Sequence, residues 1–265
     1  NSVARSGGCD MAMRDKYPDG VFCWADLRTP DLQAAKSFYG RLLGWSFELS
    51  GPQDRPYWMA TLQNKPVAGM YQAASLEAFW SSYISVDNME ASLRKWEAQG
   101  GRILMPPTKA DNAGTLAVVV DPVGATVVLW QPDTHPGAAF TRIPNTLCWN
   151  ELNTRNVLMA TEFYSGVFGW KYQTAGTETY QQILQPGADG GNGGIMDVTD
   201  MFADDVPDFW SVYFAVENAD DFVEKAKSMG GSLHHGPADI DAGRFAILSD
   251  PTGGLFQIIT LKEAN

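Results

Sequence analysis

Basic side chains and histidines are scarce in this chain of 265 residues. It has 19 Lys and Arg against 31 Asp and Glu, a formal charge of −12, and 3 His. Proteins that bind nucleic-acid phosphates or anionic membrane surfaces rely on clustered Lys and Arg, so neither is an expected partner.

Long apolar runs and paired cysteines are also missing. No apolar run approaches the roughly 20 residues that span a bilayer, and the N-terminus lacks the ordered sections of a secretory signal; we therefore expect a cytoplasmic protein. The three cysteines, Cys9, Cys23 and Cys148, are odd in number and widely spaced, which indicates reduced thiols rather than a disulfide framework or a zinc site. The apolar fraction of 45% is sufficient for a buried core.

The chain repeats itself. Residues 23–45 and 148–170 are identical at 9 of 23 aligned positions, and an F-W-S block that begins at Phe79 recurs at Phe209. Such self-similarity predicts a tandem duplication of units of about 120 residues. The predicted parts are an N-terminal extension at 1–19, partly a cloning remnant, a first domain at 20–132, a linker at 133–144 and a second domain at 145–265.

Within each unit, a short strand, an amphipathic helix and several strands follow one another, and this order occurs twice. The pattern predicts four βαβββ motifs and an α+β fold in which helices cover one side of curved sheets. In the first unit, the apolar face of the first predicted helix consists of Leu32, Ala35, Phe38 and Leu42, and Thr29 and Pro30 are its expected cap and first turn. The apolar face of the second predicted helix consists of Met89, Leu93 and Trp96, and Gly100 and Gly101 end that helix. The β-rich runs include 57–62, 83–86, 116–120 and 126–130.

Three motifs carry a family resemblance: a first strand that ends in Asp-Leu or Glu-Leu, a helix with A-x-x-F-Y-x4-G-W, and a late D-P-x-G turn. They resemble the vicinal oxygen chelate superfamily, which includes glyoxalase I, bleomycin-resistance proteins and extradiol dioxygenases, and in particular its tandem, two-domain glyoxalase-like proteins of actinobacterial type. The resemblance covers residues 20–262. It implies two tandem glyoxalase-like domains that form a single-chain pseudo-dimer with two cup-shaped sheets, so a monomer is expected.

The resemblance also locates the positions where metal-dependent members carry His, Gln or Glu ligands. The residues at those positions are Trp24, Ser81 and Val128 in the first unit and Trp149, Ser211 and Gln257 in the second. Indole offers an N–H donor and no lone pair, and valine offers no ligand atom, whereas a divalent centre needs several N, O or S ligands. We therefore expect no metal and no other cofactor in either cup.

Each first strand pairs an indole with an acid. Side-chain alternation places Phe22, Trp24 and Asp26 on the concave face and Cys23, Ala25 and Leu27 on the other face, with Trp149 and Glu151 inward in the second unit. The tryptophans are either core residues or stacking platforms. The acids either pair with Arg28, Arg244 or a backbone amide, or act as a general base or as an acceptor for a ligand, with pKa values raised by the aromatic walls.

Tyr83 and Tyr213 share a face with Ser81 and Ser211, so the cups are predicted to favour a flat, largely apolar ligand. The remaining candidates are weaker. His234 and His235 are expected to have surface or loop roles, the Gly-rich stretch 187–194 is expected to be a rim loop, and His135 has no assigned role.

Three functions remain open. The leading hypothesis is a metal-free protein that binds an aromatic natural product, for self-resistance or as a biosynthetic accessory. The second is a metal-independent enzyme of secondary metabolism that uses Asp26 or Glu151 as acid or base for isomerisation, cyclisation or hydroxylation. A metal-dependent lyase or dioxygenase is the least expected.

Overall fold

The computed structural model describes residues 13–52, 54–73, 77–177, 179–186, 191–201 and 205–262. Cys9, most of the expected N-terminal extension and residues 187–190 of the Gly-rich stretch lie outside these residues. Within the described part of the chain, no helix is long and apolar enough to cross a membrane.

The elements follow the predicted order four times. The first two motifs contain β1 (Phe22–Thr29), α1 (Leu32–Leu43), β2 (Ser46–Ser50), β3 (Tyr57–Leu62), β4 (Lys65–Gln72), β5 (Phe79–Ser85), α2 (Met89–Ala98), β6 (Arg102–Ala110), β7 (Gly114–Val120) and β8 (Thr126–Pro132). The last two contain β9 (Leu147–Thr154), α3 (Val157–Phe168), β10 (Lys171–Thr174), β11 (Tyr180–Leu184), β12 (Gly193–Asp197), β13 (Phe209–Ala215), α4 (Ala219–Ser228), β14 (Ser232–Ile240), β15 (Gly243–Ser249) and β16 (Leu255–Leu261).

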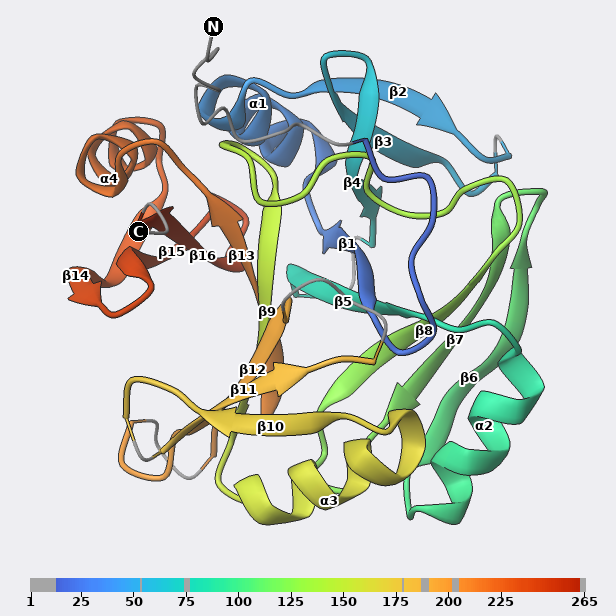
Figure 1. Ribbon diagram of the computed structural model, residues 1–265. Coiled ribbons are helices and arrows are strands. Elements are labelled where there is room, and N and C mark those ends of the chain that lie inside the picture. Colours follow the sequence, from blue (N-terminus) through green and yellow to red (C-terminus); the bar gives the residue numbers. More distant parts are fainter. Residues whose placement is uncertain are drawn as a thin grey trace, which may run out of the picture.

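Each half of the chain forms one eight-stranded sheet (Figure 1). The strand order is β2-β3-β4-β1-β5-β8-β7-β6 in the first sheet, and β10-β11-β12-β9-β13-β16-β15-β14 in the second. The first strands of the two motifs, β1 and β5, pair antiparallel in the middle of the sheet, and β9 and β13 do the same. The prediction of an α+β fold with four βαβββ motifs in two tandem domains is confirmed.

Local capping sets where the first helix begins. The carboxylate of Asp31 accepts a hydrogen bond from the backbone N–H of Ala34, so Asp31 is the N-cap and α1 starts at Leu32. The expectation that Thr29 and Pro30 would supply the cap and the first turn is therefore wrong. The helix ends at Leu43, and its C-cap, Gly44, has a left-handed φ of 71° that glycine adopts without a steric penalty.

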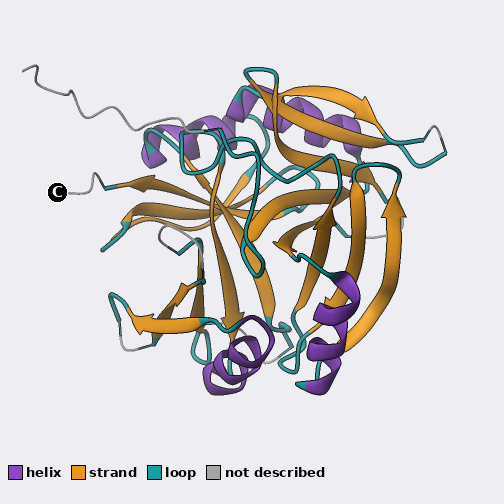
Figure 2. Cartoon of the chain, turned by 45° about the vertical axis from the view of Figure 1, so that its right-hand side comes forward, coloured by secondary structure: helices purple, strands orange, loops and turns teal. Residues whose placement is uncertain are grey.

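The two main apolar cores are shared between the halves. One contains α1 and its strands together with α4, β13, β15 and β16, and the other contains α2, β7 and β8 together with α3. The helices accordingly lie in two pairs, α1 beside α4 and α2 beside α3 (Figures 1 and 2). Figure 2 shows the strands between these two helical groups. Neither half buries its helices by itself.

Reciprocal hydrogen bonds connect the halves through the motifs that carried the family resemblance. Tyr39 of the first F-Y pair donates to Asp250 of the second D-P-x-G turn at 2.9 Å, and Tyr164 donates to Asp121 at 2.8 Å. The F-W-S indoles donate to the same hydroxyls, Trp80 to Tyr39 at 3.0 Å and Trp210 to Tyr164 at 2.9 Å. These motifs therefore build the interface between the halves.

Candidate functional site

The face of the first sheet that carries Trp24 and Asp26, called the first cup, holds a connected cluster of an indole, two phenols and a carboxyl group. Trp24 on β1 donates from Nε1 to the hydroxyl of Tyr57 on β3 at 2.8 Å. The Tyr57 hydroxyl lies 3.3 Å from Asp26 Oδ2, and the hydroxyl of Tyr83 on β5 donates to the same oxygen at 2.5 Å. Asp26 is 1% exposed. The acid is thus held by tyrosines.

Burial raises the pKa of Asp26 from 3.8 to about 6, although the hydrogen bonds from Tyr83 and Tyr57 lower it. Ser81, opposite Asp26 on β5, also lowers this pKa, but its hydroxyl does not meet Oδ1 in hydrogen-bond geometry. Among the residues that the structure describes, Oδ1 has no hydrogen-bond partner although it is buried. A buried oxygen without a donor is costly, and this atom keeps an unused capacity to accept a hydrogen bond.

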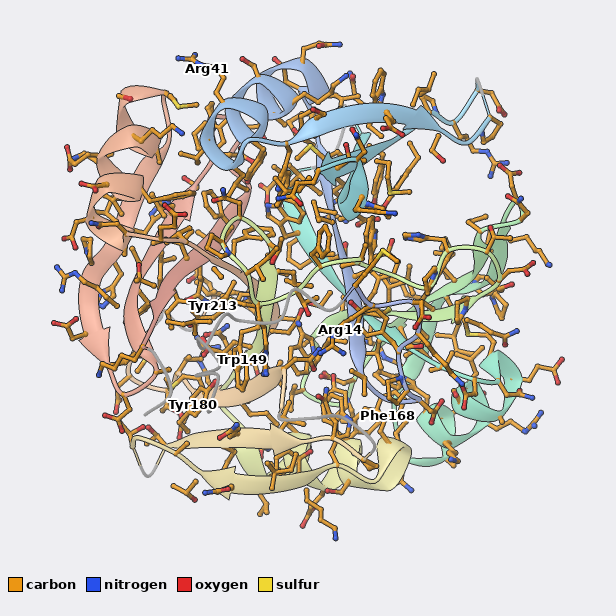
Figure 3. All side chains as sticks on the ribbon, turned by 45° about the horizontal axis from the view of Figure 1, so that its top comes forward. Arg14, Arg41, Trp149, Phe168, Tyr180 and Tyr213 are labelled. Atoms are coloured by element: carbon orange, nitrogen blue, oxygen red, sulfur yellow. The ribbon has the colours of Figure 1, made fainter. Side chains whose placement is uncertain are left out.

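The second cup repeats the arrangement around a longer acid. Trp149 on β9 donates to the hydroxyl of Tyr180 on β11 at 2.7 Å, and Tyr213 on β13 donates to Glu151 Oε1 at 3.0 Å. Figure 3 shows Trp149 near Tyr180 and Tyr213. Gln257 adds contacts that Val128 does not offer in the first cup: its Nε2 lies 2.7 Å from Ser211 Oγ and 3.5 Å from Glu151 Oε1.

Burial raises the pKa of Glu151 from 4.5 to about 7, and its hydrogen bonds to Tyr213 and Gln257 lower it in part. Asn153, one inward position further along β9, donates to Ser211 at 3.1 Å. The corresponding position on β1 is Arg28, whose charge lowers the pKa of Asp26. The two cups therefore differ in polarity as well as in their acids.

Tyr57 and Tyr180 were missed by the sequence analysis, yet both complete a cup. Each lies over a glycine in the next strand: a Cβ on Gly69 would fall 1.7 Å from the Tyr57 hydroxyl oxygen, and one on Gly194 would fall 2.0 Å from that of Tyr180. The available signal was a tyrosine that opens the third strand of each unit, followed by a glycine on the fourth.

The alternation on β1 does not extend to Phe22. The register between β1 and β5 shifts between Phe22 and Trp24, so the two side chains enter different clusters. Phe22 packs between the halves, 5.6 Å from the Trp170 ring and 4.9 Å from the Trp210 ring, whereas Cys23 joins the Trp24 cluster. The expected grouping of Phe22 with Trp24, and of Cys23 opposite it, is wrong because of this bulge.

The two arginines that were candidate partners of the cup acids, Arg28 and Arg244, contact other groups. Arg244 forms ion pairs with Asp220 and Asp239. Arg28 donates from Nε to the carbonyl oxygen of Glu77 and lies over the Phe79 ring. In the part of the chain that the structure describes, neither arginine forms an ion pair with Asp26 or Glu151.

The three histidines have different settings. His234 and His235 are exposed and lie within β14, where His234 Nε2 is 2.8 Å from Ser249 Oγ and the His235 ring is 5.6 Å from the Phe245 ring. His135, to which the sequence analysis gave no role, packs against Trp24 with 4.5 Å between ring centroids.

Comparison with known proteins agrees with the fold. The model of the Glyoxalase/Bleomycin resistance protein/Dioxygenase superfamily matches residues 22–129 and 143–258. The chain belongs to this superfamily.

Similar members of the superfamily come from actinobacteria. "Putative glyoxylase CFP32" of Mycobacterium tuberculosis is 37% identical over 265 residues, which cover 94% of this chain and 98% of that protein. "Anthracycline biosynthesis protein DnrV" of Streptomyces peucetius is 29% identical, with 94% and 96% covered.

Solved structures of the superfamily share the architecture. The Mn(II)-bound glyoxalase from Novosphingobium aromaticivorans has a TM-score of 0.67 at 18% identity, with 93% of this chain and 84% of that chain covered. The 2,3-dioxygenase LapB from Pseudomonas sp. KL28 has a TM-score of 0.65 at 14% identity, with 91% and 93% covered. At these identities the likeness establishes the fold alone.

The superfamily's metal does not fit the side chains of either cup. The indole N–H groups of Trp24 and Trp149 donate to tyrosine hydroxyls, and Val128 has no ligand atom. Gln257 directs its amide nitrogen at Ser211 and Glu151. In the part of the chain that is described, no three His, Cys, Asp or Glu side chains group as a metal site would require.

Proposed function

We propose that this protein binds flat aromatic small molecules in its two cups, without a metal centre, in the service of secondary metabolism. The observation that carries the proposal is the indole–phenol–carboxyl cluster in each half, together with the buried Asp26 Oδ1, to which no described residue donates in the first half. Aromatic rings supply a stacking surface, and a few buried polar atoms orient a ligand on it. The name of the relative DnrV, an anthracycline biosynthesis protein, supports planar polycyclic ligands.

Equilibrium dialysis with 2-naphthol tests the proposal, and cyclohexanol serves as the non-aromatic control. We expect 2-naphthol alone to bind, with up to two molecules per chain. At pH 8, where both acids are mostly ionised, Asp26→Asn and Glu151→Gln replace a charged acceptor by a neutral one, and each is expected to weaken binding in its own cup by roughly tenfold. Both variants should fold, because the amides are nearly isosteric with the acids. Absence of 2-naphthol binding, or unchanged affinity in both variants, would refute the proposal.

A second candidate function rests on the acids themselves. Burial brings the pKa of Asp26 to about 6 and that of Glu151 to about 7, within the range where a carboxyl group both accepts and returns a proton near neutral pH. Such a group supports isomerisation by proton transfer, in which the carboxylate takes a proton from a carbon beside a carbonyl and later returns one.

Deuterium exchange into α-tetralone, an aromatic ketone with such a carbon, measures this activity directly. In D2O, mass spectrometry should show faster uptake at the carbon beside the carbonyl with the wild-type protein than with Glu151→Gln. If deuterium uptake occurs only at the rate seen in buffer while 2-naphthol still binds, the catalytic hypothesis is refuted and binding remains the proposed function.

A further inference from the structure

Residues 133–140, the first part of the segment that connects the two sheets, lie against the first cup. The backbone N–H groups of Asp133 and His135 donate to the carbonyl oxygen of Ala113, at 2.9 and 3.1 Å, and that of Ala138 donates to Cys23 at 2.8 Å. The Tyr17 hydroxyl also donates to the Ala138 carbonyl oxygen, at 2.6 Å. The segment is therefore fixed to β1 and to the β6–β7 hairpin.

This segment delivers an imidazole to the aromatic wall of the first cup. The His135 ring lies edge-to-face with Trp24 at 4.5 Å and 6.0 Å from the Trp130 ring, and Trp130 Nε1 donates to the His135 carbonyl oxygen at 2.9 Å. His135 Nε2 is buried and has no hydrogen-bond partner among the described residues. Burial lowers the pKa of His135 to about 4, so the ring is neutral at physiological pH and each nitrogen is either a donor or an acceptor.

Two polar atoms without partners in the described residues thus belong to side chains that neighbour one indole, the ring of Trp24. Asp26 lies two residues along β1 from Trp24, roughly 7 Å at the rise of a strand, and its Oδ1 is also buried and without a partner in the described residues. Inward side chains of the neighbouring strands, including Met59, Leu116 and Val118, pack against this cluster and keep partial solvent exposure. Buried polar atoms without partners commonly mark a place for water or ligand atoms.

We propose that the first cup binds an aromatic molecule with hydroxyl groups at opposite ends, one on His135 Nε2 and the other on Asp26 Oδ1, with its ring against Trp24. The inference rests on the proposed function and names the ligand class of the first cup. The second cup differs, since Gln257 contacts its acid and, in the described part of the chain, no histidine ring packs on Trp149.

Calorimetric titration with 2-naphthol and 2,6-dihydroxynaphthalene tests this inference. The wild-type first cup should bind the diol about tenfold more tightly, the effect of one additional buried hydrogen bond. His135→Phe retains a ring against Trp24 and Trp130 but removes Nε2, so it should abolish the diol preference and leave the affinity for 2-naphthol within threefold. His235→Phe, on β14 of the other half, is the matched control and should keep the preference.

Three results would overturn the inference. They are a diol preference that survives in His135→Phe, no preference in the wild-type protein, and a parallel loss of affinity for both probes in His135→Phe, which would reveal a packing role alone. In all three, binding of 2-naphthol to the wild-type protein would leave the proposed function standing. Failure of both probes to bind the wild-type protein would refute the proposed function as well.

Discussion

Tyr164→Phe removes a single hydroxyl group from the interface between the halves, and its cost follows from the two groups that the hydroxyl serves. Asp121 Oδ2 would lose its donor and Trp210 Nε1 its acceptor, both in buried positions. A buried polar group without a partner costs about 1–3 kcal/mol, so for the two groups we expect the free energy of unfolding to fall by roughly 2–6 kcal/mol. The hydrogen bond from Tyr164 also lowers the pKa of Asp121, which burial raises to about 6, so its loss should raise that pKa further.

Urea unfolding at pH 7, followed by tryptophan fluorescence, measures this change. Tyr172→Phe is the matched control, because the Tyr172 hydroxyl is buried with no hydrogen-bond partner in the described residues, so its removal leaves no buried group unpaired and should not lower the free energy of unfolding. Equal effects of Tyr164→Phe and Tyr172→Phe would refute the interface role assigned to Tyr164.

Two further predictions concern the cups. Because the pKa of Glu151 is raised from 4.5 to about 7 in the fold, the folded state holds a proton that the unfolded state releases in this window, so the free energy of unfolding should fall on the order of 3 kcal/mol as pH rises from 4.5 to above 7. Urea unfolding at both pH values should show that Glu151→Gln removes this part of the slope; an unchanged slope contradicts the burial of the acid. Gly69→Ala should displace the Tyr57 ring, since the new Cβ would lie 1.7 Å from its hydroxyl oxygen, and dialysis should show weaker binding of 2-naphthol. Full affinity in Gly69→Ala would show that Tyr57 does not shape the first cup.

Periodicity predicted the architecture well because the repeat supplied each element twice. The apolar positions Leu32, Ala35, Phe38 and Leu42 of α1 are all buried as expected, and so are Met89, Leu93 and Trp96 of α2. The helix start was displaced by two residues, because the carboxylate of Asp31 reaches the Ala34 N–H and so competes with the hydroxyl of Thr29 for the cap.

The candidate site was only partly predictable from the sequence. Alternation, a local property, placed Trp24 with Asp26 and Tyr83 with Ser81 on the inward faces of their strands, and the structure brings Trp24, Asp26 and Tyr83 together. Tyr57 reaches the same acid from β3, and this depends on the curvature of the sheet and on the space above a glycine. His135 lies in the segment that joins the sheets, and hydrophobic periodicity, which applies to helices and strands, cannot predict what a loop residue contacts.

The two halves of the chain agree where they contact each other and differ where they face their cups. The tyrosine–aspartate pairs of the interface are the same in both directions. The cup positions carry Asp26 against Glu151 and Val128 against Gln257. Since each core needs helices from both halves, a change at the interface alters stability everywhere, whereas a change inside a cup leaves the other cup and the cores in place. The motifs that identify the superfamily therefore specify how the halves assemble, and the side chains that distinguish the two cups lie outside those contacts.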